Sequence, residues 1–95
     1  SPTEVEEAVY ATGLVAEAAA FGVDHPALGQ AIVLVAVPAE GRTADPDSLL
    51  ALCRDRLPAY MVPQRIDWVE GALPRNANGK IDRKRLAAER EGLFR

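Results

Sequence analysis

The sequence predicts one small α+β domain, in which a three-stranded sheet is flanked by helices in the order α-β-β-α-β-α. Three observations predict this fold. A capping residue followed by proline marks two helix starts, at Ser1-Pro2 and Asp45-Pro46. Residues 31–37 form a continuous apolar run, which is typical of a strand buried on both faces. Residues 65–69 alternate and are β-prone. A chain of 95 residues has room for a single core.

The first helix is predicted over residues 2–12. Ser1 is placed to cap it, and Glu4 completes a capping box by reaching back to the free backbone N–H of Ser1. Apolar side chains then recur on one face of the helix. Gly13 follows as a C-terminal cap, because glycine adopts the left-handed conformation needed there.

Two strands are predicted next. Residues 14–23 are small and apolar around the single charge of Glu17, and we interpret them as a strand that ends near Gly22. Residues 24–29 have the composition of a turn. The apolar run 31–37 is the second strand, so the two strands are expected to pair antiparallel.

The second half of the chain adds a helix, a strand and a last helix. Residues 38–44 are expected to form a loop, and a helix over 46–57 ends at Pro58. A strand over 65–69 follows this helix, so it is expected to run parallel to the second strand. After an irregular loop over 71–79, Asp82 is placed to cap a final helix that reaches about Arg90.

The net charge of −3 conceals an uneven distribution. Residues 75–90 hold six basic and two acidic side chains, a balance of +4, so the rest of the chain carries −7. This basic segment is either a surface that faces polyanions or a solvated helix. Nucleic acid is not the expected partner, because the basic segment is short and contains no aromatic residues.

Common catalytic and metal-binding patterns are absent from the sequence. His25 is expected in a surface turn and Cys53 in the core, so the two are not expected to act together. No cluster of ligands has metal-site spacing, and we predict no metal site. The longest apolar run has seven residues, far below the roughly 20 of a membrane span. One cysteine cannot form an internal disulfide, and we expect the protein to be cytoplasmic.

Lys80 is the candidate for chemistry. It follows Asn78-Gly79, a turn dipeptide that is expected to leave the next side chain projecting from a loop tip. An ammonium there is a movable point charge. On composition alone, an exposed lysine without a role is the simpler interpretation.

Four segments change that interpretation, because together they resemble the C-terminal subdomain of the adenylate-forming superfamily. This superfamily includes acyl-CoA synthetases, adenylation domains of nonribosomal peptide synthetases, and luciferases. The segments follow one another in the order found in the family. They are Ser1-Pro-Thr-Glu-Val-Glu-Glu7, Gly22-Val-Asp-His-Pro-Ala-Leu-Gly-Gln30, Leu57-Pro-Ala-Tyr-Met-Val-Pro63 and Leu73-Pro-Arg-Asn-Ala-Asn-Gly-Lys-Ile-Asp-Arg-Lys-Arg-Leu86.

The resemblance implies a two-step reaction that uses ATP with Mg²⁺. A carboxylic acid is first converted to an acyl-adenylate with release of pyrophosphate, and a thiol then displaces AMP to form a thioester. Lys80 matches the catalytic lysine of the family, and Gly79, Arg83, Lys84 and Arg85 are expected to contact phosphates of ATP or coenzyme A. For each of the three basic residues that follow Lys80, a solvated helix surface is the alternative.

The resemblance also implies that residues 1–95 form a mobile lid subdomain of a longer, AMP-forming acyl-CoA ligase. The partner of this lid is the N-terminal adenylation lobe of the same chain, and the lid rotates between the two steps. The chain opens on a helix start without an initiator methionine, so we expect it to be a piece of that protein. Taken alone it is expected to be inactive and to bind ATP or coenzyme A only weakly.

Two further alternatives stay open at this stage. The lobe either serves coenzyme A or docks a carrier protein with its phosphopantetheine thiol, as in peptide synthetases. A non-catalytic module with the same fold is the other alternative. Gln30 and the segment 76–78 depart from the residues frequent in the family, and neither departure is expected to affect the function assigned to Lys80.

Overall fold

The computed structural model describes residues 1–43 and 45–95. Within them, the predicted order of elements and the α+β fold class are confirmed. One short helix, η1, was not expected. In chain order the elements are α1 (Pro2–Ala11), β1 (Val15–His25), β2 (Gly29–Pro38), α2 (Pro46–Arg56), the 3₁₀ helix η1 (Ala59–Met61), β3 (Arg65–Trp68) and α3 (Arg83–Glu89).

The three strands form one sheet in the order β1-β2-β3. β1 and β2 pair antiparallel as a hairpin, and β3 pairs parallel with β2 from Val33↔Arg65 to Ala36↔Trp68. Both pairings confirm the predictions. The central strand β2 is therefore hydrogen-bonded on both sides, whereas β1 and β3 are the edges of the sheet.

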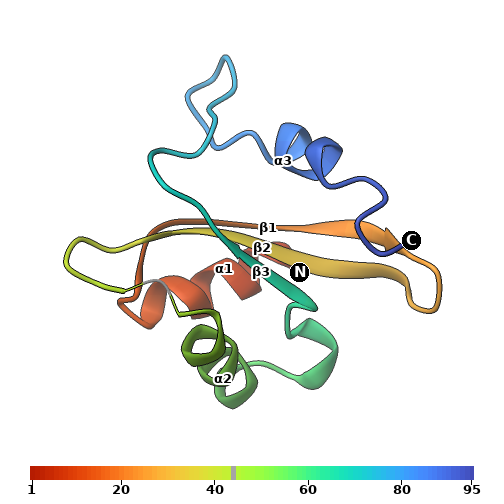
Figure 1. The fold of residues 1–95 in the computed structure, drawn as a ribbon, viewed down its shortest axis with the longest axis horizontal. Coiled ribbons are helices and arrows are strands. Elements are labelled where there is room, and N and C mark those ends of the chain that lie inside the picture. Colours follow the sequence, from red (N-terminus) through yellow and green to blue (C-terminus); the bar gives the residue numbers. More distant parts are fainter. Residues whose placement is uncertain (44) are drawn as a thin grey trace.

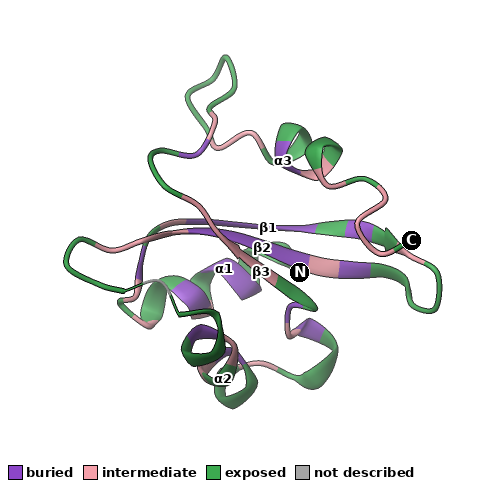
Figure 2. Cartoon of the chain, viewed as in Figure 1, coloured by how far each residue is buried: buried purple, intermediate pink, exposed green. Residues whose placement is uncertain are grey.

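The sheet lies between two layers (Figure 1). Helices α1 and α2 cover one face, which we call the helix side. Helix α3 and the irregular segment before it cover the other face, which we call the hairpin side. Figure 2 shows buried residues along β1 and β2, between these layers. Side chains of β2 alternate accordingly, since Leu34 and Ala36 belong to the apolar cluster of the helix side and Val33 and Val35 to that of the hairpin side.

The predicted end of the first strand and the turn after it were wrong. The strand was expected to end near Gly22, with a turn over 24–29, but β1 continues to His25 and β2 already begins at Gly29. Gly22 therefore lies inside the strand, where it leaves room for a side chain of β2. A Cβ atom at this position would lie 2.6 Å from Oε1 of Gln30.

The remaining boundaries differ from the predictions by one or two residues. Thr12 is the C-cap of α1 rather than a helical residue, and Gly13 follows with the expected positive φ of 74°. The predicted loop over 38–44 ends on Ala44, which lies outside the described residues. The capping box at Ser1 and Glu4 is present as predicted.

A β-bulge in β1 sets the direction of an important carboxylate. The register with β2 shifts between Val15 and Glu17. Val15 and Ala18 both join the apolar cluster of the helix side, whereas Glu17 contacts the segment on the hairpin side. An extra residue in a strand shifts the alternation of the side chains in this way.

Two side chains of α1 form hydrogen bonds with backbone groups on the open edge of β1. The Tyr10 hydroxyl accepts a hydrogen bond from the Ala18 N–H (2.9 Å) and donates one to the Ala18 carbonyl (3.3 Å). The buried carboxylate of Glu6 accepts from the Ala20 N–H (2.7 Å). Unpaired backbone groups at a sheet edge invite pairing with other chains, so these contacts also protect the edge.

Candidate functional site

The segment that carries Lys80 is a small hairpin that projects from the hairpin side of the sheet (Figure 1). Arg75 and Ile81 form an antiparallel bridge at its base. Above that bridge, the Asn76 N–H donates to the Lys80 carbonyl (2.8 Å) and the Gly79 N–H donates to the Asn76 carbonyl (3.0 Å). We call residues 75–81 the lysine hairpin.

The side chain of Asn76 closes the turn from within. Its Oδ1 atom accepts hydrogen bonds from the backbone N–H groups of Asn78 (2.9 Å) and Lys80 (3.1 Å). Gly79 completes the turn with a φ of 79°, in the left-handed region that favours glycine. The backbone of Lys80 is thus held at both its N–H and its carbonyl.

One detail of the predicted turn needs correction. Lys80 was expected at the loop tip, but residues 77–79 form the tip and Lys80 begins the returning arm. The structure also shows that Asn76 binds the Lys80 backbone directly. An asparagine side chain can mimic a backbone turn by accepting from an N–H two residues on, and this signal was available in the sequence.

Two carboxylates hold residues on either side of Lys80. Glu17 of β1 accepts from the Leu73 N–H (2.9 Å) and forms an ion pair with Arg75. Glu6 of α1 accepts two hydrogen bonds from Arg83, at 2.8 Å from Nε and 2.5 Å from Nη2. The hydrogen bond to Glu6 raises the pKa of Arg83. Neither glutamate was singled out as a site residue from the sequence.

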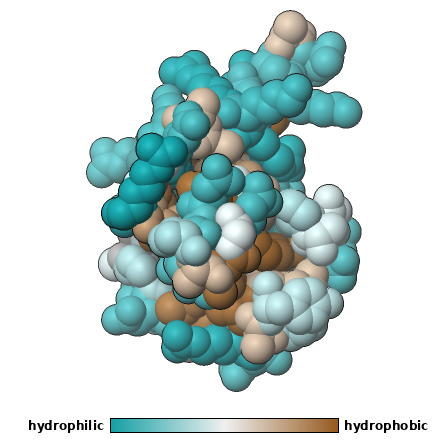
Figure 3. All heavy atoms as spheres, turned by 90° about the vertical axis from the view of Figure 1, so that its right-hand side faces the viewer, coloured by the Kyte–Doolittle hydropathy of each residue, from teal (hydrophilic) through white to brown (hydrophobic). Residues whose placement is uncertain are grey.

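The cations around the hairpin differ in what they contact. Arg83 pairs with Glu6 and Arg85 with Glu89 (3.5 Å). Lys80 and Lys84 are exposed, and no carboxylate of the described residues lies within 4.0 Å of either ammonium. In Figure 3 the upper part of the molecule, which includes this hairpin and α3, is mostly hydrophilic. The two lysines are therefore available to an anion from outside.

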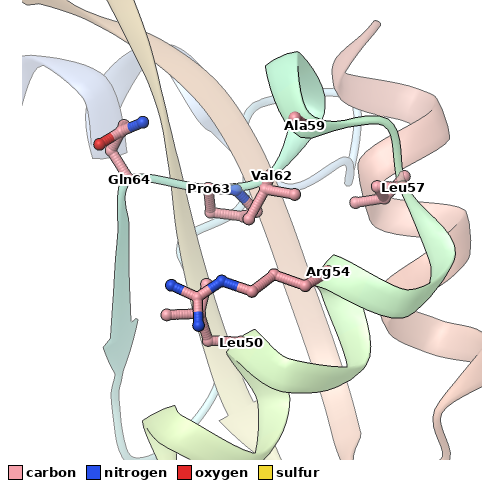
Figure 4. Close-up of a pocket in the computed structure, with 7 residues that line it drawn as sticks. All are labelled: Leu50, Arg54, Leu57, Ala59, Val62, Pro63 and Gln64. Carbon is pink, nitrogen blue, oxygen red and sulfur yellow. The ribbon is translucent and has the colours of Figure 1, made fainter.

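A groove of about 460 Å³ lies on the helix side (Figure 4), on the opposite side of the sheet from the lysine hairpin (Figure 1). Arg54 of α2 extends across it toward the segment that follows η1. Apolar side chains of α2 and of that segment form its walls. The lining residues are Leu50, Arg54, Leu57, Ala59, Val62, Pro63 and Gln64. None of these residues was predicted as a site residue.

His25 and Cys53 do not form a site. The His25 ring accepts at Nδ1 from the backbone N–H groups of Ala27 (3.1 Å) and Leu28 (3.2 Å), so it caps the turn between β1 and β2. Cys53 is buried in the core as predicted, and burial raises the pKa of its thiol. Across the described ranges, no group of three or more His, Cys, Asp and Glu side chains is arranged to hold a metal ion.

A comparison with known protein families identifies the family of this chain. The family model described as the AMP-binding enzyme C-terminal domain matches residues 4–80. The chain belongs to this family. The matched region runs from the first turn of α1 to Lys80, and it includes both glutamates that hold the lysine hairpin.

Relatives of this AMP-binding enzyme C-terminal domain are CoA ligases. It is 42% identical over 86 residues to 3-methylmercaptopropionyl-CoA ligase of Ruegeria pomeroyi, covering 90% of this chain and 16% of that protein. It is 36% identical over 87 residues to a probable CoA ligase of Humulus lupulus, covering 92% and 16%. The chain thus spans about a sixth of the length of these two relatives.

A solved structure has the same fold. The crystal structure of ATP-bound MatB from Rhodopseudomonas palustris matches with a TM-score of 0.90 and 28% identity, over 99% of this chain and 18% of that one. This AMP-binding enzyme C-terminal domain therefore shares its complete fold with part of a larger protein. In the portion that the structure describes, no helix has the length and apolar character needed to cross a membrane.

Proposed function

We propose that this chain is the C-terminal lobe of an AMP-forming acyl-CoA ligase and that Lys80 is its catalytic residue for carboxylate adenylation. The observation that carries the proposal is the lysine hairpin itself. It presents an exposed ammonium with no carboxylate partner among the described residues, while hydrogen bonds hold the backbone of the same residue. A mobile positive charge on an ordered backbone suits a reaction between two anions.

Adenylation develops negative charge at the place where Lys80 would act. A carboxylate oxygen of the acid bonds to the α-phosphorus of ATP, while the bond from that phosphorus to the bridging oxygen of the β-phosphate breaks and pyrophosphate leaves. Charge spreads over the phosphoryl oxygens in the transition state. An ammonium placed beside the acid and the α-phosphate lowers the repulsion between them and stabilises that charge.

Thioester formation is the second step of the proposed activity. The thiol of coenzyme A loses its proton, its sulfur attacks the carbonyl carbon of the adenylate, and AMP leaves with the electrons of the broken bond. Coenzyme A is proposed as the thiol because the two relatives described above are CoA ligases. We propose that the lobe rotates against the N-terminal adenylation lobe between the steps, which withdraws Lys80 before the thiol arrives.

Other residues have supporting roles in this proposal. Lys84 is free to contact a phosphate of ATP or coenzyme A, whereas Arg83 and Arg85 would have to leave or share their carboxylate partners to do so. Gly79 has no side chain and, apart from its chain neighbours, no atom within 4 Å of where its Cβ would be, so its backbone is open to contact by a phosphate. Among the described residues no group of three or more His, Cys, Asp and Glu side chains could hold a metal ion, and we assign no ligand for the magnesium of ATP to this domain.

Lys80→Ala in the full-length protein tests the proposal, with the two half-reactions assayed separately. The adenylation rate should fall by on the order of 10²–10³, which is typical for loss of one preorganised electrostatic donor. Thioester formation from supplied acyl-adenylate should change far less. Lys80→Arg should restore little, because a planar guanidinium does not replace a compact ammonium. An unchanged adenylation rate would refute the role of Lys80.

Arg42→Ala is a matched control for charge. It removes a cation that is also exposed, from the loop after β2 that lies away from the lysine hairpin. Both half-reactions should keep their normal rates in this variant. Equal losses in both half-reactions of Lys80→Ala would instead indicate damage to the fold or a general binding role.

The proposal also concerns the chain by itself and its location. The isolated 95 residues should bind ATP weakly, because most nucleotide contacts would come from the N-terminal lobe. Titration calorimetry that gave micromolar binding would contradict this. We place the full protein in the cytoplasm, which supplies both ATP and coenzyme A.

A further inference from the structure

Two glutamates that are distant from Lys80 in the sequence contact residues a few positions before and after it. Glu6 is on α1, on the helix side, and Glu17 is on the edge strand β1. Both reach the segment that carries Lys80, one before the lysine and one after it. Neither glutamate belongs to the lysine hairpin, so their contacts connect the hairpin to the body of the domain.

Glu17 holds the arm that leads to the turn. One carboxylate oxygen accepts from the Leu73 N–H (2.9 Å), and the other pairs with the Arg75 guanidinium. The Nη1 atom of Arg75 in turn lies 3.5 Å from the Gly79 carbonyl, to which it donates. A continuous polar path therefore runs from β1 to the residue directly before Lys80.

Glu6 holds the arm that leaves the turn. Its carboxylate accepts from both Nε and Nη2 of Arg83, three residues after Lys80, and also from the Ala20 N–H at the edge of β1. The side chain of Glu6 is only 9% exposed. A buried carboxylate with three donors has little freedom to move, so it fixes the start of α3 relative to both α1 and the sheet.

Apolar packing does little to hold the lysine hairpin. From Arg75 to Lys80 every residue is exposed, and Ile81 is only partly buried against the cluster of the hairpin side. An exposed hairpin without apolar contacts is free to sample many orientations, at an entropic cost whenever one of them is required. Polar contacts at its base are what restrict it here.

We propose that Glu6 and Glu17 are positioning residues for Lys80, which hold the chain before the lysine at Leu73 and Arg75 and after it at Arg83, so that the ammonium points at the reacting phosphate. This inference rests on the proposed function of Lys80. It differs from a phosphate-binding role for Arg75 and Arg83, because it assigns the two guanidinium groups to carboxylates of this domain. Removing a carboxylate then impairs the reaction although it leaves both arginines in place.

A double-mutant cycle in the full-length protein tests the proposal. Glu17→Gln keeps an acceptor for the Leu73 N–H but removes the charge that holds Arg75. It should lower the adenylation rate by about 10- to 100-fold, the effect expected from a misplaced catalytic group. In a Lys80→Ala background the same change should have less than about a 2-fold effect, because no ammonium remains to be positioned.

A second double-mutant cycle uses Glu6→Gln in place of Glu17→Gln and should give the same pattern of adenylation rates. The melting temperature is recorded for every variant. If Glu6→Gln prevents folding, the cycle with Glu17→Gln tests the proposal alone. Glu17→Asp should restore part of the rate because it keeps the charge. Thioester formation from supplied adenylate should stay near normal in all of these variants.

Asp67→Asn is the matched control. Asp67 also forms carboxylate–arginine pairs, with Arg65 and Arg90, but it joins β3 to the end of α3 and contacts neither the lysine hairpin nor Arg83. Its loss should leave the adenylation rate within about 2-fold of normal. Equal effects of Glu17→Gln with and without Lys80 would overturn the positioning role. A normal rate in Lys80→Ala would overturn the proposed function first, and with it any role in positioning.

Discussion

The helix side and the hairpin side of the sheet are held to it by different forces. On the helix side, five buried residues outside the sheet pack on the strands, namely Val5, Val9, Leu49, Cys53 and Met61. On the hairpin side, two buried residues outside the sheet do so within the described ranges, Leu73 and Leu86, and they are joined by partly buried apolar side chains and by two carboxylate–arginine pairs. Non-directional apolar packing serves to stabilise a fold, whereas directional ion pairs serve to orient a particular side chain.

The difference suggests a division of labour between the two sides. Mutations on the helix side should mainly change the free energy of unfolding, and mutations in the lysine hairpin should mainly change catalysis. Four variants test this division, beginning with the largest expected effect on stability.

Leu34→Ala should cause the largest loss in the free energy of unfolding. Leu34 is fully buried on the central strand, so the change removes apolar contacts and leaves a cavity. We expect a loss of about 2–5 kcal/mol in the free energy of unfolding, measured by urea denaturation of the 95-residue chain. The control is Leu28→Ala, since Leu28 is 56% exposed in the turn between β1 and β2. Similar losses for both leucines would contradict the assignment of the core.

Gly79→Ala should cost about 1 kcal/mol, because alanine is strained at a φ of 79° even though the space around it is open. Gly71→Ala is matched to it, with a φ of 77° and no neighbouring atom within 4 Å. We expect similar losses of stability from both, but a lower adenylation rate only from Gly79→Ala. If both variants slowed adenylation alike, the effect would not belong to the hairpin.

Asp67 should make a smaller contribution that depends on pH. Burial acts to raise its pKa, but hydrogen bonds and charge from Arg65 and Arg90 outweigh burial and hold the pKa below the usual value. A lowered pKa means that the ionised form stabilises the fold. This contribution, about 1 kcal/mol or less, is present above the ordinary carboxyl pKa near 4 and is lost as the pH falls through the lower native value.

Melting temperatures of the wild-type chain and of Asp67→Asn between about pH 2 and pH 6 check this dependence. The two curves should lie apart at the upper end of the range and converge as the pH falls. A constant separation across the whole range would show that ionisation of Asp67 does not contribute.

Lys80→Ala should have the smallest effect on stability. The side chain is exposed and has no carboxylate partner among the described residues. We expect a change within about 0.5 kcal/mol in urea denaturation, together with the large loss of adenylation described above. A loss of several kcal/mol would show that the Lys80 side chain stabilises the fold, and it would contradict the proposed division between the two sides.

Much of the fold was predictable because its signals are local. Proline after a capping residue marked the starts of α1 and α2, and the apolar run of β2 marked a strand buried on both faces. The prediction was wrong at Gly22, which looked like the end of a strand. It lies inside β1 instead, where the Gln30 side chain of the neighbouring strand comes close to it, a contact that no local pattern reveals.

For the site, the sequence by itself determined the position of Lys80 after an Asn-Gly turn, because turn chemistry depends on adjacent residues. The tertiary structure alone decided that Glu6 and Glu17 hold the arms of that turn. In the sequence, Glu6 is separated from Arg83 by 77 positions, and Glu17 is separated from Arg75 by 58. The bulge in β1 directs Glu17 toward the hairpin side, and the Ala20 N–H at the open edge of β1 donates a hydrogen bond to Glu6. Contacts of this kind exist only once the layers have assembled around the sheet.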